Sequence, residues 1–374
     1  MEAGNPGGRE RITAMKKALK IILIIIIAAV LIVGAYVAYV FLSYHRIPDK
    51  QAAEIDNSPE AAEELAAGEE LSLTTWNLGF GAYVQDYSFF MDGGDESRAR
   101  SEKVLTDNME AISDTLAKYD SNLYLLQEVD FDGTRTLHVD ECRIIREHFS
   151  EKSYAFAQNY DSPYLFYPVT SPHGANKSGI VTLSEAKITD SLRRSLPIQS
   201  GFQKILDLDR CFSVSRIPVD DGRELVLINA HLSAYTTDPK VNEKQLNMLY
   251  DTMLREYEAG NYVICGGDFN KDLLGNSPEH FEGVALGADE NWCQPFPVED
   301  IPDSITLVAA YDAKAKTPSC RNTDTGYVKG ETFVCTVDGF LVTDNVHVSG
   351  AAVENEEFMC SDHNPVTMKF VLGK

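Results

Sequence analysis

The chain has few basic residues, no internal repeat and no zinc-type cysteine spacing, and each shortage excludes a class of protein. Its 374 residues include 33 Lys and Arg against 57 Asp and Glu, which gives a formal net charge of −24 at pH 7. Such an acidic surface repels polyanions, so tight and non-specific binding of nucleic acid is disfavoured. Nuclease activity is not excluded, because transient engagement at a metal site needs no basic face. The lack of repeats and low-complexity linkers argues against a repeat array.

Seven cysteines are present, but they show neither CxxC spacing nor a His at zinc-finger distance. A structural zinc site is therefore not expected. The odd number leaves at least one thiol unpaired or paired between chains. Cys265 lies in an apolar run and is interpreted as a small buried hydrophobe. Cys320 and Cys335 are a candidate disulfide, and the sequence does not decide whether they are bridged.

Long hydrophobic runs are also scarce, and the only one extends from Ile21 to Leu42. As a helix this run is about 33 Å long, enough to cross the ~30 Å hydrocarbon core of a bilayer. The positive-inside rule then predicts that residues 1–20 form a basic cytoplasmic terminus and that the rest of the chain lies outside the plasma membrane. A cleaved signal peptide is the alternative, but the run is long for one and no small-x-small cleavage site follows. The basic residues before the run are Arg9, Arg11, Lys16, Lys17 and Lys20.

Residues 43–70 are rich in Ala, Glu and Asp, which predicts a solvated acidic stalk, and residues 71–374 are expected to form one domain. Apolar periodicity predicts a strand at Leu71 to Asn77 and a helix at Ser101 to Tyr119, with Ser101 as its N-cap. The whole pattern predicts two stacked sheets covered by helices. Further strands are expected at 123–128, 154–158, 179–183, 211–217, 225–232, 262–265, 334–342, 346–351 and 366–371, and further helices at 139–149 and 239–258.

Short polar motifs gather at the ends of these apolar runs. Each motif alone is typical of a strand-end turn, because Asn and Asp side chains bond nearby backbone there. Four of them follow or finish a strand and the last precedes one, so they are expected to converge on one rim of the sandwich. The motifs are Thr75-Trp76-Asn77, Gln127-Glu128-Val129, Asn229-Ala230-His231-Leu232, Gly266-Gly267-Asp268-Phe269-Asn270 and Ser361-Asp362-His363.

These residue types together suit phosphoester hydrolysis. That reaction needs a hard cation to neutralise the phosphate and lower the pKa of water, a base for the attacking water, and donors for the developing charge. Carboxylates suit Mg²⁺ or Mn²⁺, whereas neutral Asn and His suit phosphate oxygens and proton transfer. The sequence therefore predicts a metal-dependent phosphoester-cleaving site.

In the order of these motifs, residues 71–372 resemble the endonuclease/exonuclease/phosphatase superfamily. This superfamily includes secreted DNases, AP endonucleases, sphingomyelinases and inositol polyphosphate 5-phosphatases. The resemblance implies a four-layer α/β sandwich, made of two packed mixed β-sheets flanked by helices and preceded here by one transmembrane helix. AP endonucleases usually carry Tyr at the position of His231, so this residue argues against that branch.

The resemblance also implies the metal ligands. Glu128 matches the family's main metal-binding glutamate, and Asp362 matches a second metal-facing carboxylate. Asn77 matches the asparagine that helps to position the metal and the phosphate. The expected cofactor is Mg²⁺, with Mn²⁺ or Ca²⁺ as alternatives.

The catalytic residues implied by the resemblance are His231, Asp268, Asn270, Asp338 and His363. His363 matches the general base, and Asp338 matches the acid that fixes its tautomer. His231 and Asn270 match groups that contact the phosphate. Asp268 matches a residue that orients or deprotonates water, so whether Asp268 or His363 takes the proton stays open.

The substrate stays open as well. A membrane-tethered phosphodiesterase for lipid headgroups is the first hypothesis, an anchored DNase-like endonuclease the second, and a catalytically inactive binding module the third. The membrane and a phosphoester are the expected partners, with no obligate protein partner. The aromatic segments Gly79 to Arg100 and Ser162 to Gly179 are interpreted as local core or as a substrate surface. Lys177, Arg98 and Arg100 are candidate phosphate contacts or solvated surface residues.

Overall fold

The computed structural model describes residues 6–201, 204, 208–234, 238–286 and 292–373, and it divides into two units, Met1–His45 and Arg46–Lys374. The first unit is the helix α1, Pro6–Ser43. Its segment Arg11–Ser43 is long and apolar enough to cross a membrane. The predicted span of residues 21–42 lies inside this helix, while the sidedness of the chain stays a prediction.

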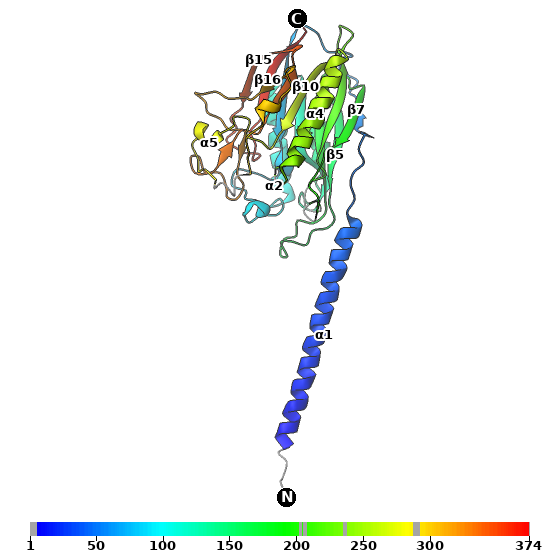
Figure 1. Cartoon of the computed structure of the whole chain (residues 1–374), viewed down its shortest axis with the longest axis vertical. Coiled ribbons are helices and arrows are strands. Elements are labelled where there is room, and N and C mark those ends of the chain that lie inside the picture. Colours follow the sequence, from blue (N-terminus) through cyan, green and yellow to red (C-terminus); the bar gives the residue numbers. More distant parts are fainter. Residues whose placement is uncertain (1–5, 202–203, 205–207, 235–237, 287–291, 374) are drawn as a thin grey trace. The chain divides into compact units, whose positions relative to one another are not determined.

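The second unit is built on two seven-stranded mixed sheets (Figure 1). The first sheet has the order β1 (Gln51–Ala52), β7 (Asp190–Ser195), β8 (Cys211–Pro218), β9 (Glu224–His231), β10 (Tyr262–Asp268), β14 (Asp338–Thr343) and β11 (Ile305–Val308). The second has the order β15 (Val346–Val353), β16 (Val366–Leu372), β3 (Glu70–Asn77), β4 (Leu123–Gly133), β6 (Asn176–Ser184), β5 (Ser153–Asp161) and β2 (Glu54–Asp56). A small ribbon pairs β12 (Cys320–Arg321) with β13 (Val334–Cys335).

The main core lies between the two sheets. Leu73 and Leu125 of the second sheet pack in one buried cluster with Leu227, Ile264 and Phe340 of the first. Burying side chains of this size stabilises the fold by about 1.5–3 kcal/mol each. The facing sheets are therefore joined by an apolar layer.

Helices cover the outer faces of both sheets. Helix α4 (Pro239–Glu258) runs along the strands in Figure 1, and its Leu249 and Met253 pack with Val263 on the outer face of the first sheet. Helices α2 (Glu102–Tyr119) and α3 (Glu141–His148) cover the second sheet, and a single turn, α5 (Ser277–His280), lies before β11. The predicted four-layer α/β sandwich is confirmed.

Local signals for α2 hold in the structure. The Ser101 side chain accepts a hydrogen bond from the Val104 backbone N–H, which satisfies one of the unpaired donors at the helix start. The apolar residues at helical spacing face the second sheet, and Met109 and Ile112 are fully buried there. The predicted N-cap and the predicted helix are confirmed.

The prediction of a solvated stalk over residues 43–70 is wrong. Strands β1 and β2 lie in this segment and pair with β7 and β5 at the edges of the two sheets. Leu65 is buried in the core between the sheets, and the compact unit begins at Arg46. An edge strand takes its stability from backbone hydrogen bonds to the sheet, so this polar segment pairs without an apolar period.

Smaller differences concern short elements and the cysteines. Strands β7, β11 and β12 were not expected, and the predicted strand at residues 334–342 is divided into β13 and β14. Cys265 is fully buried, as predicted. All seven cysteines are free thiols, although Cys320 and Cys335 lie opposite each other on β12 and β13.

Candidate functional site

The predicted site residues continue the core-facing side of their strands. Side chains two residues apart share one face of a strand. On β9 the face that carries Leu227 reaches His231, and on β10 the face that carries Ile264 reaches Asp268. Asn77 ends β3 in the same way. Where the apolar layer stops, the same alternation therefore places polar groups between the two sheets.

Strand register brings three of these groups together. His231 lies opposite Asp268 in the parallel pair of β9 and β10. Asp338, the first residue of β14, lies opposite Asp268 on its other side. One edge of the first sheet therefore carries an imidazole and two carboxylates on three adjacent strands.

Glu128 is aimed at the same edge by a bulge in β4. The pairing of β4 with β6 shifts register between Leu126 and Val129. Glu128 itself has a φ of 54°, in the left-handed region that non-glycine residues seldom adopt. Bulges re-aim side chains, and strained backbone of this kind is concentrated at functional sites. The Glu128 side chain keeps 22% of its surface exposed, so it faces open space.

The segment after β10 is fixed because the backbones of β9 and β10 lie very close together at Gly267. Gly267 has a φ of +142°, and a Cβ atom there would lie 2.0 Å from the Ala230 backbone oxygen. Only glycine fits this position. The Asn270 backbone N–H then donates to Asp268 Oδ1 at 2.8 Å, and the Asn270 amide donates to the Leu232 backbone oxygen at 2.9 Å.

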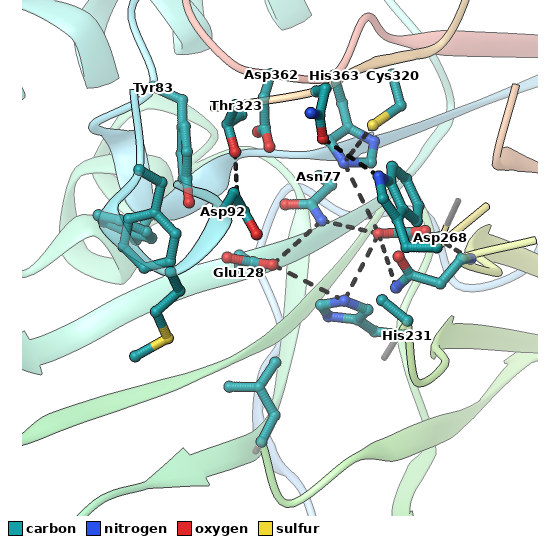
Figure 2. A pocket seen from close by; sticks show the side chains of 18 of the residues that line it. Asn77, Tyr83, Asp92, Glu128, His231, Asp268, Cys320, Thr323, Asp362 and His363 are labelled. Atoms are coloured by element: carbon teal, nitrogen blue, oxygen red, sulfur yellow. Dashed lines mark hydrogen bonds and ion pairs between the residues drawn. The ribbon is translucent and has the colours of Figure 1, made fainter. Parts of the chain in front are cut away.

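Asn77 connects the two sheets at the centre of the site (Figure 2). Its amide nitrogen lies 3.0 Å from Asp268 Oδ2 and 3.4 Å from Glu128 Oε1. Its side-chain oxygen, Oδ1, accepts a hydrogen bond from the Gly79 backbone N–H at 3.0 Å. Asn77 is therefore placed to orient the two carboxylates, and a direct bond from it to a metal stays a prediction.

His231 faces both carboxylates. Its Nε2 lies 3.6 Å from Asp268 Oδ2 and 3.8 Å from Glu128 Oε1. Burial, with the charge of Arg210 adding to it, lowers the pKa of His231 well below its ordinary range. A neutral imidazole at this position suits contact with a phosphate oxygen.

His363 and Asp338 form a buried pair beside Asp268. His363 Nδ1 lies 2.7 Å from Asp338 Oδ2, and His363 Nε2 lies 3.8 Å from Asp268 Oδ2. Asp338 also accepts from the Ser319 hydroxyl at 2.7 Å. The contact fixes the ring of His363 and leaves its Nε2 facing the site, as an oriented acid or base requires.

Burial and neighbouring charges shift the pKa values of three groups in this cluster. Burial opposes the charged form of His363, but Asp338 outweighs it, and the pKa of His363 is raised. Burial raises the pKa of Asp268 to about 6, against the lowering effect of the His363 charge. Burial also raises the pKa of Asp362, and Glu128 adds to that rise.

The fold around this site is similar to known structures. No family model and no curated protein matches the sequence. An endonuclease/exonuclease/phosphatase from Beutenbergia cavernae DSM 12333 superposes with a TM-score of 0.54 at 16% identity, covering 81% of this chain and 72% of that chain. The chain has the endonuclease/exonuclease/phosphatase fold. The resemblance predicted from the motif order is thus confirmed at the level of the fold.

Two further structures align over most of their length. An endonuclease/exonuclease/phosphatase from Bacteroides vulgatus gives a TM-score of 0.48 at 13% identity, covering 81% of this chain and 99% of that chain. D. rerio TDP2, complexed with single-strand DNA product, gives 0.49 at 17% identity, with 81% and 99% covered.

Two motif residues hold the endonuclease/exonuclease/phosphatase sandwich together behind the site. The Gln127 amide donates to Asn229 Oδ1 at 2.8 Å, which joins β4 to β9 across the core. The Asn229 amide donates to backbone oxygens of Leu126 and Val181 at 3.1 and 2.9 Å. Both side chains are fully buried, so these hydrogen bonds fix the distance between the sheets.

A cleft of about 270 Å³ opens above the site. All predicted site residues except Asp338 line it, and Asp338 lies behind His363. The sequence did not reveal Arg135, Arg210 and Arg321, which line it too. The cleft wall also includes apolar and aromatic residues, namely Phe80, Tyr83, Phe89, Met91, Tyr160 and Trp292.

The basic residues suggested by the sequence lie elsewhere. Arg100 forms ion pairs with Asp86 and Glu96, and Lys177 lies 3.6 Å from Asp132. None of Arg98, Arg100 and Lys177 lines the cleft. The arginines of the cleft come from segments without a motif, so only the folded chain reveals them.

Two groups of residues offer ligand atoms for a divalent cation. Asp268, Asp338 and His363 offer ligand atoms that all lie within 4.8 Å of one another. The short Asp338–His363 contact, however, already uses both of those groups. Glu128 and Asp362 are separate from this pair and offer the carboxylate oxygens that Mg²⁺, Mn²⁺ and Ca²⁺ prefer.

Proposed function

We propose that this protein is a membrane-anchored, extracytoplasmic phosphodiester hydrolase that depends on Mg²⁺. We infer three points together: the protein depends on a metal, the metal is Mg²⁺, and the folded domain lies on the outer side of the membrane. It is supported by the fold and by the apolar N-terminal helix.

One observation carries the proposal. Five separate segments bring Asn77, Glu128, His231, Asp268 and His363 into a single cleft. Polar groups at such depth cost free energy unless they are hydrogen-bonded. A set that combines an oriented imidazole, a buried carboxylate and a partly exposed carboxylate suits hydrolysis of a phosphoester.

Each residue has a role that its geometry supports. A cation bound by Glu128 and Asp362 would neutralise the phosphate and lower the pKa of the attacking water. His363 is held by Asp338 and presents Nε2 beside Asp268, so a water molecule bound there would contact both groups that can exchange a proton. His231 and Asn270 line the same cleft, and His231 would donate to a phosphate oxygen as negative charge develops.

Asp268 and His363 share the proton-transfer role at this position. Asp268 is held on one side by the Asn77 amide and on the other by the Asn270 backbone N–H. These two donors stabilise its ionised form and orient the oxygen that faces His363. Asp268 and His363 would therefore act on the same water molecule.

The substrate class that fits the acidic chain is a small phosphodiester or a lipid headgroup. A net charge of −24 disfavours lasting contact with a nucleic acid backbone. An anchored endonuclease is the second candidate, because the cleft contains three arginines. A binding module without catalysis is the third, and it gives no chemical reason for the oriented pair of His363 and Asp338.

The deciding experiment uses the full chain in detergent micelles with sphingomyelin and plasmid DNA as parallel substrates. We expect Mg²⁺-dependent cleavage of the lipid, lost with a chelator and in His363→Ala. His347→Ala is the matched control, since His347 is exposed on β15 and is absent from the cleft. Cleavage of DNA alone would favour the endonuclease. No cleavage together with no Mg²⁺ binding by calorimetry would contradict the enzyme.

The location is tested separately in intact cells. A protease added outside should remove an epitope placed after Lys374 and leave one placed before Met1 protected. The reverse result would show that the domain lies in the cytoplasm.

A further inference from the structure

The first residues of the folded unit lie at the edge of the sandwich that carries the site. This unit begins at Arg46, whose Nε donates to Asp209 Oδ1 at 2.6 Å. The Ile47 backbone N–H donates to the other oxygen of the same carboxylate. The next residue, Arg210, lines the cleft. Strand β8 starts directly after Arg210 and pairs there with the end of β9 that carries His231.

The covalent chain connects this edge closely to the apolar helix. The predicted span ends at Leu42, and Arg46 follows four residues later. Four residues of extended chain reach at most about 14 Å. This limit follows from the covalent chain and holds for any orientation of the helix. An anchor that spans the membrane therefore keeps the cleft edge close to the bilayer surface.

A loop with an apolar tip lies at the same edge. Residues 162–175 join the end of β5 to the start of β6, and residues 166–169 form the tip of this loop. Phe166 is 56% exposed, Tyr167 69% and Val169 83%. Single exposed apolar side chains are ordinary, but several together on one loop mark an interaction surface.

The tip is fixed beside the cleft. At the base of the loop Leu165 and Gly174 exchange two backbone hydrogen bonds, each of 3.0 Å. The Tyr167 ring lies 5.7 Å from the ring of Phe90. The next residue, Met91, lines the cleft and is 47% exposed. The tip and the cleft wall are therefore neighbours.

The loop differs in charge from the rest of the chain. Residues 162–175 contain no Asp, Glu, Lys or Arg, although the chain has a net charge of −24. Their only histidine, His173, is buried, which lowers its pKa to about 4 and leaves it neutral at pH 7. Charged side chains are costly in the apolar layer of a membrane, and Tyr is enriched at its interface. Binding of a nucleic acid backbone, in contrast, relies on Lys and Arg.

We propose that the tip and the cleft edge form a membrane-contact surface, and that the cleft takes its phosphodiester from a lipid headgroup of the bilayer that anchors the chain. The tip enters the interface of that bilayer with its apolar side chains. This inference rests on the proposed function and narrows its substrate class to a membrane lipid.

Fluorescence quenching tests the membrane contact without any need for activity. The full chain is placed in phosphatidylcholine nanodiscs with and without bromine on the acyl chains. Tyr167→Trp should lose emission in the brominated nanodiscs, beyond the loss that Trp76 and Trp292 give in the wild type. His347→Trp is the matched control, because His347 is exposed and lies level with the start of β3, at the opposite edge from Asn77. Equal losses in the two variants would overturn the inference.

The same variant distinguishes a lipid from a nucleic acid partner. Single-stranded oligothymidylate should leave the emission of Tyr167→Trp unchanged. Quenching by the oligonucleotide without any response to bromine would assign the tip to base stacking and overturn the inference. Failure of the proposed function gives a different result, namely that bromine still quenches Tyr167→Trp while sphingomyelin and plasmid DNA both stay intact.

A double variant measures what the tip does for the reaction. Tyr167→Ser combined with Val169→Ser should lower the hydrolysis of sphingomyelin in nanodiscs at least about tenfold, because the apolar area that enters the bilayer is lost. Hydrolysis in detergent micelles should be unchanged. Tyr167→Trp combined with Val169→Leu keeps the tip apolar and should retain the rate in nanodiscs. Equal losses in nanodiscs and micelles would show that the tip supports the cleft and does not contact the membrane.

Discussion

The two halves of the cleft differ in how their acidic groups are satisfied. On one side Asp338 is fully buried and accepts from His363 and Ser319. On the other side Glu128 is partly exposed, and the charge of Asp362 acts on the buried Tyr83 hydroxyl. A buried carboxylate with fixed hydrogen-bond donors orients its neighbours, whereas clustered and partly exposed carboxylates attract cations. The first half is therefore suited to proton transfer and the second to binding a metal.

The largest effect should come from breaking the proton-transfer half. Asp338→Asn keeps the shape of the side chain but removes the charge that orients His363. We expect kcat to fall by about 10²–10⁴-fold, the usual range for loss of an oriented acid or base. The measurement is steady-state hydrolysis of the substrate found for the wild type. Mn²⁺ affinity should stay within about threefold, and a parallel loss of both would show that the two halves are not separate.

The next effect concerns the wall beside Glu128 and Asp362. His173 is buried against Phe89 and Phe90, and its Nδ1 lies 2.7 Å from the Ser97 backbone oxygen. Burial, aided by the charge of Arg135, lowers the pKa of His173 to about 4. Between about pH 6.5 and pH 4 the unfolded chain binds a proton here that the folded chain does not, so folding stability falls as the pH falls through this window.

The loss should reach about 3 kcal/mol of unfolding free energy at pH 4, since one pKa unit is worth about 1.4 kcal/mol. Urea unfolding of wild type and His173→Gln at pH 7 and pH 4 measures it. The variant should lose less stability than the wild type over this interval. The same loss in both proteins would assign the pH dependence to other groups.

A third effect follows from cation binding itself. A ligand present at 100 times its dissociation constant stabilises the folded state by about 2.7 kcal/mol. Saturating Mg²⁺ should therefore raise the unfolding temperature of the wild type and of Asp338→Asn, but not that of Glu128→Gln. Differential scanning calorimetry with and without chelator makes the comparison. A rise that survives in Glu128→Gln and disappears in Asp338→Asn would move the metal to the buried half.

The two halves also differ in how far the sequence predicted them. His231 and Asp268 follow continuous apolar runs that mark two buried strands, so the rim where they meet could be predicted from the strand pattern. Asp92 of the cleft lies in a loop, and its carboxyl group accepts a hydrogen bond from Thr323, more than two hundred residues away in the chain. The edge strands β1 and β2 were missed for a related reason, because pairing at a sheet edge leaves no period in the sequence.

The smallest effect should come from the thiol that borders the proton-transfer half. Cys320 Sγ lies 3.5 Å from His363 Nε2, on the side of the ring that faces the cleft. A thiol is a weak hydrogen-bond partner, so its loss costs less than loss of the charged Asp338. Cys320→Ala should change kcat by less than about tenfold, since one ordinary hydrogen bond contributes about 1 kcal/mol. Cys142→Ala, a buried thiol outside the cleft, is the control. If Cys320→Ala lost as much kcat as Asp338→Asn, the thiol would take part in proton transfer. The charged neighbour of His363 would then matter no more than the neutral one.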